Sequence, residues 1–146
     1  MTYSVLIEFK AEYPCSGFEH IYGADSLAEQ LSESLSAMAN LVVVTQDLWN
    51  DFGWLIEMEF AEVLFTLYFA KYGPDEKWQL TIEPNVKTSF ISRILGKKQA
   101  TFVEELKVVS LCIEDYLCTD KDVCELKFTT TKKNADWVNS IGDLEW

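Results

Sequence analysis

Residues 54–60, WLIEMEF, and residues 63–72, VLFTLYFAKY, decide the fold of this chain. The first segment alternates apolar residues with glutamates, which is typical of a β-strand with one solvated face. The second segment is richer in apolar residues on both faces. Only Ala61 and Glu62 separate the two segments, so the spacing predicts a tight hairpin turn, although neither residue favours positive φ.

A third strand extends this unit. After a loop at residues 73–75, residues 78–83 again alternate apolar and polar positions. Pro84 ends the pattern because proline lacks a backbone donor. We therefore predict three consecutive antiparallel strands in the middle of the chain.

The flanking segments add two helices and further strands. Apolar residues recur every three or four positions in two stretches, which indicates two amphipathic helices. The spacing of a capping box occurs near the start of each stretch, at Ser26 with Glu29 and at Thr101 with Glu104. The predicted apolar stripes are Leu27, Leu31, Leu35 and Met38 in the first helix and Phe102, Leu106, Val109, Ile113, Tyr116 and Leu117 in the second. Alternating or short apolar runs predict strands at residues 3–9, 41–44 and 124–129.

This order of elements predicts an α+β fold, with a mainly antiparallel sheet and two amphipathic helices packed on one face. We expect residues 1–130 to form a single α+β domain. Residues 131–146 lack a strong period but contain Trp137, Ile141, Leu144 and Trp146. We therefore expect a C-terminal tail that is docked or partly flexible.

Acidic residues dominate the composition. The chain has 146 residues, with 12 Lys and Arg against 24 Asp and Glu, a net charge of −12 and a pI near 4.4. This charge repels phosphate backbones and anionic lipids, so we expect no nucleic-acid partner and no membrane partner. No apolar stretch reaches the roughly 20 residues that span a bilayer. Because the N-terminus also lacks a signal-peptide pattern, we expect a cytoplasmic protein with reduced cysteines.

Catalytic and metal-binding motifs are missing from the sequence. Cys112, Cys118 and Cys124 are spaced six residues apart, unlike the C-x2-C pairs of zinc sites. His20 is the only histidine, and no nucleophile elbow, zinc-protease motif or glycine-rich phosphate loop occurs. We therefore expect no metal, no cofactor and no enzymatic activity.

The segment 47–54, DLWNDFGW, combines aromatic and acidic residues where the pattern predicts a loop entering a strand. Aromatic residues are common interface hot spots, and surrounding carboxylates attract a cationic partner. In the alternative interpretation Phe52 and Trp54 plug the end of the core, which leaves Trp49 as the better binding residue. The predicted partner-binding residues are Asp47, Trp49, Asp51, Phe52, Glu57 and Glu59.

Residues 84–103 contain four bases and no acid, unlike the rest of the chain. A short helix through residues 90–95, ended by Gly96, accounts for this basic segment, and an anion site is the alternative. The four bases are Lys87, Arg93, Lys97 and Lys98.

By the motifs in its middle third, the chain resembles a type of small bacterial protein. They are Gly53-Trp54 before a strand, Trp78-x-Leu80-x-Ile82-Glu83-Pro84, and Gly96-Lys97-Lys98 at the end of the basic segment. In size, acidity and lack of catalytic motifs, the chain also resembles the immunity proteins that neutralise toxin domains in bacterial contact-dependent and secreted toxin systems. This resemblance implies an inhibitor and no catalytic residue.

We therefore predict an immunity or inhibitor protein that binds a basic toxin domain, with a nuclease as the expected class, and occludes it with an acidic, aromatic surface. The alternative is a small-molecule-binding or regulatory domain with a pocket between the sheet and the helices. A structural subunit of a larger assembly is the third hypothesis.

Overall fold

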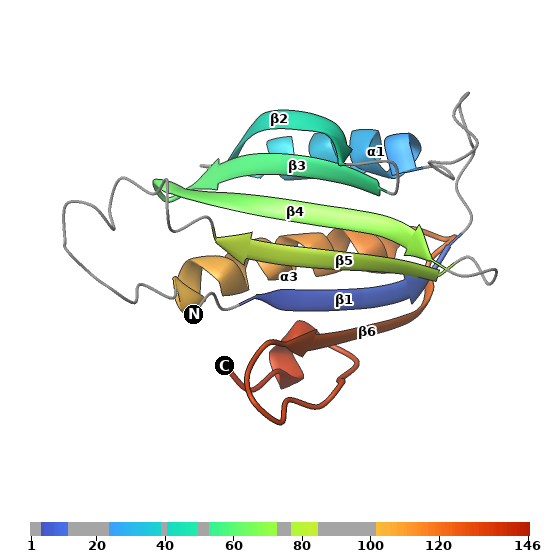
Figure 1. Ribbon diagram of the computed structural model, residues 1–146, viewed down its shortest axis with the longest axis vertical. Coiled ribbons are helices and arrows are strands. Elements are labelled where there is room, and N and C mark those ends of the chain that lie inside the picture. The colour runs from blue at the N-terminus through green and yellow to red at the C-terminus, as the bar shows by residue number, and fades with distance from the viewer. Residues whose placement is uncertain (1–3, 12–23, 39–40, 50–52, 73–76, 85–101) are drawn as a thin grey trace.

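The computed structural model describes residues 4–11, 24–38, 41–49, 53–72, 77–84 and 102–146. Within these ranges the chain forms six β-strands, two α-helices and one short 3-10 helix (Figure 1). In chain order the elements are β1 (Val5–Lys10), α1 (Ala24–Ser36), β2 (Leu41–Trp49), β3 (Gly53–Phe60), β4 (Val63–Tyr72), β5 (Lys77–Pro84), α3 (Val103–Thr119), β6 (Cys124–Thr130) and η2 (Ile141–Asp143).

The six strands form one antiparallel sheet in the order β2-β3-β4-β5-β1-β6. Both α1 and α3 lie on the same face of this sheet (Figure 1). The hydroxyl of Tyr116 on α3 donates a hydrogen bond of 2.5 Å to Oε1 of Gln30 on α1. The opposite face carries neither of these helices, and we call it the open face. The predicted α+β fold is therefore confirmed.

The hydrophobic core lies between the sheet and the two helices. In β1 and β5 every second residue is buried, as their period-2 patterns predict, and β4 buries Thr66 in addition to alternate residues. The helices bury Leu27, Leu31 and Leu35 of α1 and Leu106, Val109, Ile113 and Leu117 of α3. Trp78 of β5 is fully buried, and its indole nitrogen donates a 3.0 Å hydrogen bond to the carbonyl of Ala11.

Strand β2 is longer than the sequence pattern predicts. The expected strand ended at residue 44, whereas β2 continues to Trp49 after a bulge between Val43 and Thr45. Asp47 and Trp49 therefore belong to a strand and not to the expected loop. A bulge interrupts the alternation by which a strand is recognised in a sequence. Beyond the bulge, β2 pairs with β3 as far as Gly53, which satisfies the backbone groups of β3.

Neither helix starts at the residue that was expected to cap it. Helix α1 begins at Ala24, so Ser26 lies inside its first turn. The N-cap of α3 is Phe102, which has a φ of 49° and makes no side-chain cap hydrogen bond, and Thr101 lies outside the described residues. The first turn of α3 instead carries two acidic residues, which are favourable near the positive end of the helix dipole.

The turn between β3 and β4 adopts positive φ values, which neither of its two central residues favours. Phe60 pairs with Val63, which confirms the predicted two-residue turn. Ala61 and Glu62 have φ values of 51° and 65°. Two central residues with positive φ are typical of a type I′ turn, in which Asn and Gly are the favoured residues. The chain therefore holds two ordinary side chains in the left-handed region.

Replacing Ala61 by Asn and Glu62 by Gly is expected to raise the free energy of unfolding by about 1–2 kcal/mol, because both new residues adopt positive φ at lower cost. Denaturant unfolding measures the change. As a control, Glu59→Gly in the adjoining strand should destabilise the protein by roughly 0.5–1 kcal/mol. A double variant that is no more stable than the wild type would contradict this turn geometry.

The C-terminal residues 131–146 pack along β6 and against α3. The backbone N–H groups of Phe128 and Val138 each donate to the other's carbonyl at 2.8 Å. Ile141 is fully buried, and its N–H donates a 2.7 Å hydrogen bond to Oε2 of Glu114 on α3. Part of the outer edge of β6 is thereby paired, which limits its exposure to other strands.

Candidate functional site

Acidic and hydroxyl side chains lie in a row across three adjacent strands of the open face, with a half-buried glutamate on either side of a buried threonine. In this row Glu57 of β3 lies opposite Thr66 of β4, and Thr66 lies opposite Glu83 of β5. Paired residues of antiparallel strands lie on the same face, so these three side chains share the open face. Glu59, two residues along β3, lies on this face too and is exposed. We call Glu57, Glu59 and Glu83 the acidic strip.

Hydrogen bonds fix the carboxylate of Glu83. The hydroxyl of Ser4 donates to its Oε2 at 3.4 Å, and the hydroxyl of Tyr68 donates to the same carboxylate. Ser4 is held in turn by Thr131, because the Ser4 N–H donates to the Thr131 Oγ1 at 3.0 Å and the Thr131 N–H donates back to the Ser4 carbonyl at 3.1 Å. One acid of the strip is therefore oriented by hydrogen bonds within the chain.

Tyr68 lies beside the acidic strip on β4. Burial, the charge of Glu83 and the hydrogen bond to it raise the pKa of the Tyr68 hydroxyl, and the charge of Glu57 acts in the same direction. A hydrogen bond with Thr66 acts in the opposite direction. The phenol therefore remains a neutral donor at physiological pH and places an aromatic ring next to carboxylates.

Apolar side chains border the acidic strip on the side of β2. Glu59 lies between Val42 of β2 and the half-buried Leu64 of β4 in the strand register. Val42 is 61% exposed and Val44 is 50% exposed. These two valines add exposed apolar area beside the carboxylates of the strip.

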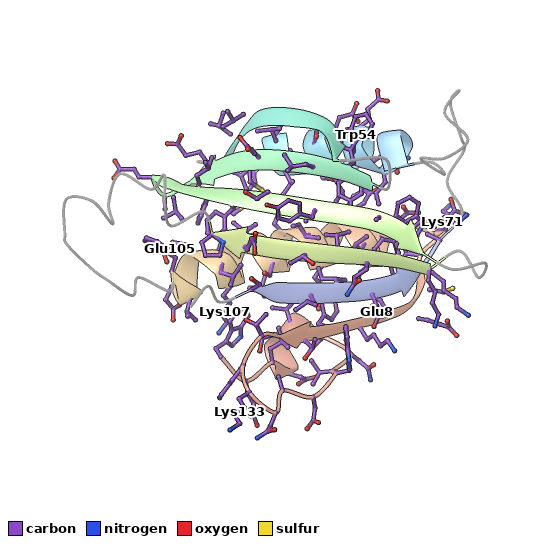
Figure 2. The ribbon with its side chains drawn as sticks, in the orientation of Figure 1. Glu8, Trp54, Lys71, Glu105, Lys107 and Lys133 are labelled. Carbon is purple, nitrogen blue, oxygen red and sulfur yellow. The ribbon has the colours of Figure 1, made fainter. Side chains whose placement is uncertain are left out.

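Two of the six predicted partner-binding residues, Glu57 and Glu59, lie in the acidic strip. Asp51 and Phe52 lie outside the described residues. Trp54, labelled on β3 in Figure 2, is half-buried and packs against the core. This position of Trp54 agrees with the alternative interpretation, in which it closes the end of the core.

Asp47 and Trp49 lie on the edge strand β2, where the backbone register places them opposite Leu55 and Gly53. Gly53 allows β3 and β4 to approach closely, because an added Cβ would lie 2.3 Å from the carbonyl oxygen of Phe69. Glycine is thus required at the start of β3, where this strand packs closely against β4.

Sequence reasoning missed Tyr68 and Glu83. The two-residue turn at residues 61–62 fixes the register of β3 and β4, and this register places Tyr68 on the same face as Glu57. The position of Tyr68 could therefore have been derived from the turn. That of Glu83 depends on the connection at residues 73–76, a length compatible with several registers.

The described cysteines are free thiols, namely Cys112, Cys118 and Cys124. Burial raises the pKa of the Cys112 thiol, and the charge of Asp115 raises it further. Burial also raises the pKa of the Cys118 thiol, with smaller contributions in the same direction from the charges of Glu114 and Asp115. Both thiols are therefore protonated and weakly nucleophilic at neutral pH.

Among the described residues, no three His, Cys, Asp or Glu side chains are grouped to hold a metal ion. Outside the described residues lie Cys15, His20, Lys87, Arg93, Lys97 and Lys98.

A cavity of about 340 Å³ lies among β1, β5, β6 and the C-terminal residues. A smaller cavity of about 80 Å³ lies between the end of β6 and the C-terminal residues. Neither cavity has a lining residue from α1 or α3. Neither therefore corresponds to the pocket between sheet and helices that the alternative functional hypothesis requires.

Comparisons of the chain with protein-family models, curated proteins and solved structures give no match. In the part of the chain that the structure describes, no helix is long and apolar enough to cross a membrane. The geometry of the acidic strip is therefore the basis for a functional proposal.

Proposed function

We propose that this chain is an immunity-type inhibitor that binds a basic toxin domain through the acidic strip. The observation that supports this proposal is the position of Glu57, Glu59 and Glu83 together on the open face, away from both helices and next to Tyr68. The net charge of −12 gives the whole molecule the same sign as this surface. A cationic partner is thus attracted at long range and oriented at short range.

A toxin nuclease is the partner class that this surface fits best. A nuclease must be cationic where it holds phosphate groups, so its active site carries the charge that the acidic strip complements. When the acidic strip binds at this active site, it blocks the basic groups that otherwise bind the nucleic acid. Inhibition by occlusion needs no catalytic residue on the chain.

The geometry of the strip suits the basic side chains of such a partner. Glu57 and Glu83 flank Thr66, and a guanidinium or ammonium group above this row would donate charge-assisted hydrogen bonds to the two carboxylates. The ring of Tyr68 adds a cation–π contact. Val42 and Val44 contribute exposed apolar area at the margin.

A growth assay tests the proposal. The tagged chain is used to capture its partner from the native host, and the captured domain is then expressed alone and together with the chain. We expect the domain to be toxic and the wild-type chain to restore growth. The charge reversals Glu57→Lys and Glu83→Lys, made together, should abolish this protection because they place two cations against a cationic site.

The matched control is Glu29→Lys with Glu33→Lys. Both residues are exposed on α1, on the face opposite the strip, and the double change alters the net charge equally. The control should protect like the wild type. Equal loss of protection in both double variants, or capture of a partner that is not toxic, would contradict the proposal.

A further inference from the structure

The cavity of about 340 Å³ contains a cluster of lysines in an otherwise acidic protein. It lies at the other end of the open face from the acidic strip, because six residues of β5, or about 20 Å, separate Glu83 from Lys77. Figure 2 labels Glu8 on β1 at the edge of this region. The polar lining residues are Glu8, Lys10, Lys77, Glu125, Lys127 and Asn139.

The strand register brings the three lysines together. Lys10 of β1 lies directly opposite Lys77 of β5, and Glu8 of β1 lies directly opposite Lys127 of β6. All four side chains therefore share the open face. Lys127 is also placed by Trp137, whose ring centroid is 5.4 Å from its ammonium nitrogen.

A bulge in β6 lies beside this cluster. The register between β1 and β6 shifts between Glu8 and Lys10, and Glu125 on the bulged strand has a φ of 54°. An inserted residue bends the strand and redirects the neighbouring side chains. The bulged residue Glu125 is exposed, so the bulge does not serve to bury its side chain.

The carboxylate of Glu125 already occupies this cluster as an internal anion. Its Oε2 lies 3.0 Å from the Nζ of Lys10. The hydrogen bond and charge of Lys10 lower the pKa of Glu125, and the charges of Lys77 and Lys127 lower it further. Because the Glu125 side chain is 62% exposed, this ion pair contributes little to stability, and an external anion can replace the carboxylate at small cost.

We propose that this cavity, which we call the lysine groove, binds the phosphate group of a small phosphorylated molecule, with displacement of Glu125. Once that carboxylate leaves, three lysines and Glu8 carry a formal charge of +2 in the groove. A phosphate monoester, at about −1.5 to −2 near pH 7, balances this charge better than a single carboxylate does. The volume lies in the range of small-molecule sites and exceeds the space that the phosphate group needs. The organic part therefore has room beside Asn139.

NMR titration of the ¹⁵N-labelled full chain tests the proposal, at pH 7.5 and constant ionic strength, with inorganic phosphate and with glycerol phosphate as probes. We expect saturable shifts for amides of residues 8–10, 77, 125–127 and 139 with both probes. Tighter binding of glycerol phosphate would identify an organic phosphate as the ligand, whereas equal binding would identify free phosphate. Shifts that do not saturate, or that spread evenly over the surface, would overturn the proposal.

Three charge variants locate the site. Lys77→Gln should weaken phosphate binding about fivefold, and Glu125→Gln should tighten it by a similar factor, as expected for one unit charge a few ångströms away. Lys133→Gln removes the same charge from an exposed residue outside the groove, labelled in Figure 2, and should leave the affinity unchanged. Equal weakening by Lys77→Gln and Lys133→Gln, or no tightening by Glu125→Gln, would show that the binding is unspecific. Since the groove and the acidic strip share no residue, failure here leaves the inhibitor proposal intact.

Discussion

Replacing Leu106 by Ala is expected to lower the free energy of unfolding by about 2–5 kcal/mol. Leu106 lies at the end of the first turn of α3, is fully buried, and belongs to the core that joins the helices to the sheet. The substitution removes buried apolar area and leaves a cavity that the packed strands cannot fill. Equilibrium unfolding in denaturant, followed by circular dichroism, measures the loss.

The matched control is Leu111→Ala on the same helix. Leu111 is 40% exposed, so the same chemical change removes much less buried area and leaves no closed cavity. We expect its effect to stay below about 1 kcal/mol. Similar losses for the two variants would mean that the face of α3 toward the sheet is assigned wrongly.

The fold was predictable where the sequence alternates regularly. The strands around residues 54–60 and 78–83 and the leucine stripe of α1 follow from periods of two and of three to four residues. The bulged half of β2 was not predictable, because a bulge breaks the alternation. The start of α3 was also missed, since Phe102 in a left-handed conformation carries no side-chain signal of a cap.

The candidate site was predictable only in part. Glu57 and Glu59 stand out as charged positions on a half-solvated strand. Their neighbours across the sheet depend on strand register, which short-range patterns specify poorly unless a turn fixes it. Glu83 joins the strip through β5, and the lysine groove combines residues from three strands and the C-terminal segment. Clusters of this kind arise from topology and have no motif.

The second large effect concerns the rate of association with the toxin domain. Replacing Glu57 and Glu83 by Gln is expected to slow association about tenfold at low salt, because steering by complementary charge raises association rates by factors of this order. The neutral amides keep the size of the side chains and the hydrogen-bonding capacity toward Ser4 and Tyr68. Glu29→Gln with Glu33→Gln on α1 removes equal charge from the opposite face and should slow association much less.

The most direct test of the acidic strip as the binding surface is the salt dependence of this association rate, measured by stopped-flow fluorescence with the captured toxin domain. Exposed charges are screened within about 8 Å at physiological ionic strength, so the wild-type rate should fall steeply as salt is raised while the dissociation rate changes little. The slope should flatten for the Glu57→Gln, Glu83→Gln variant and remain steep for the Glu29→Gln, Glu33→Gln variant. A salt-independent wild-type rate, or one common slope for all three proteins, would contradict binding through the acidic strip.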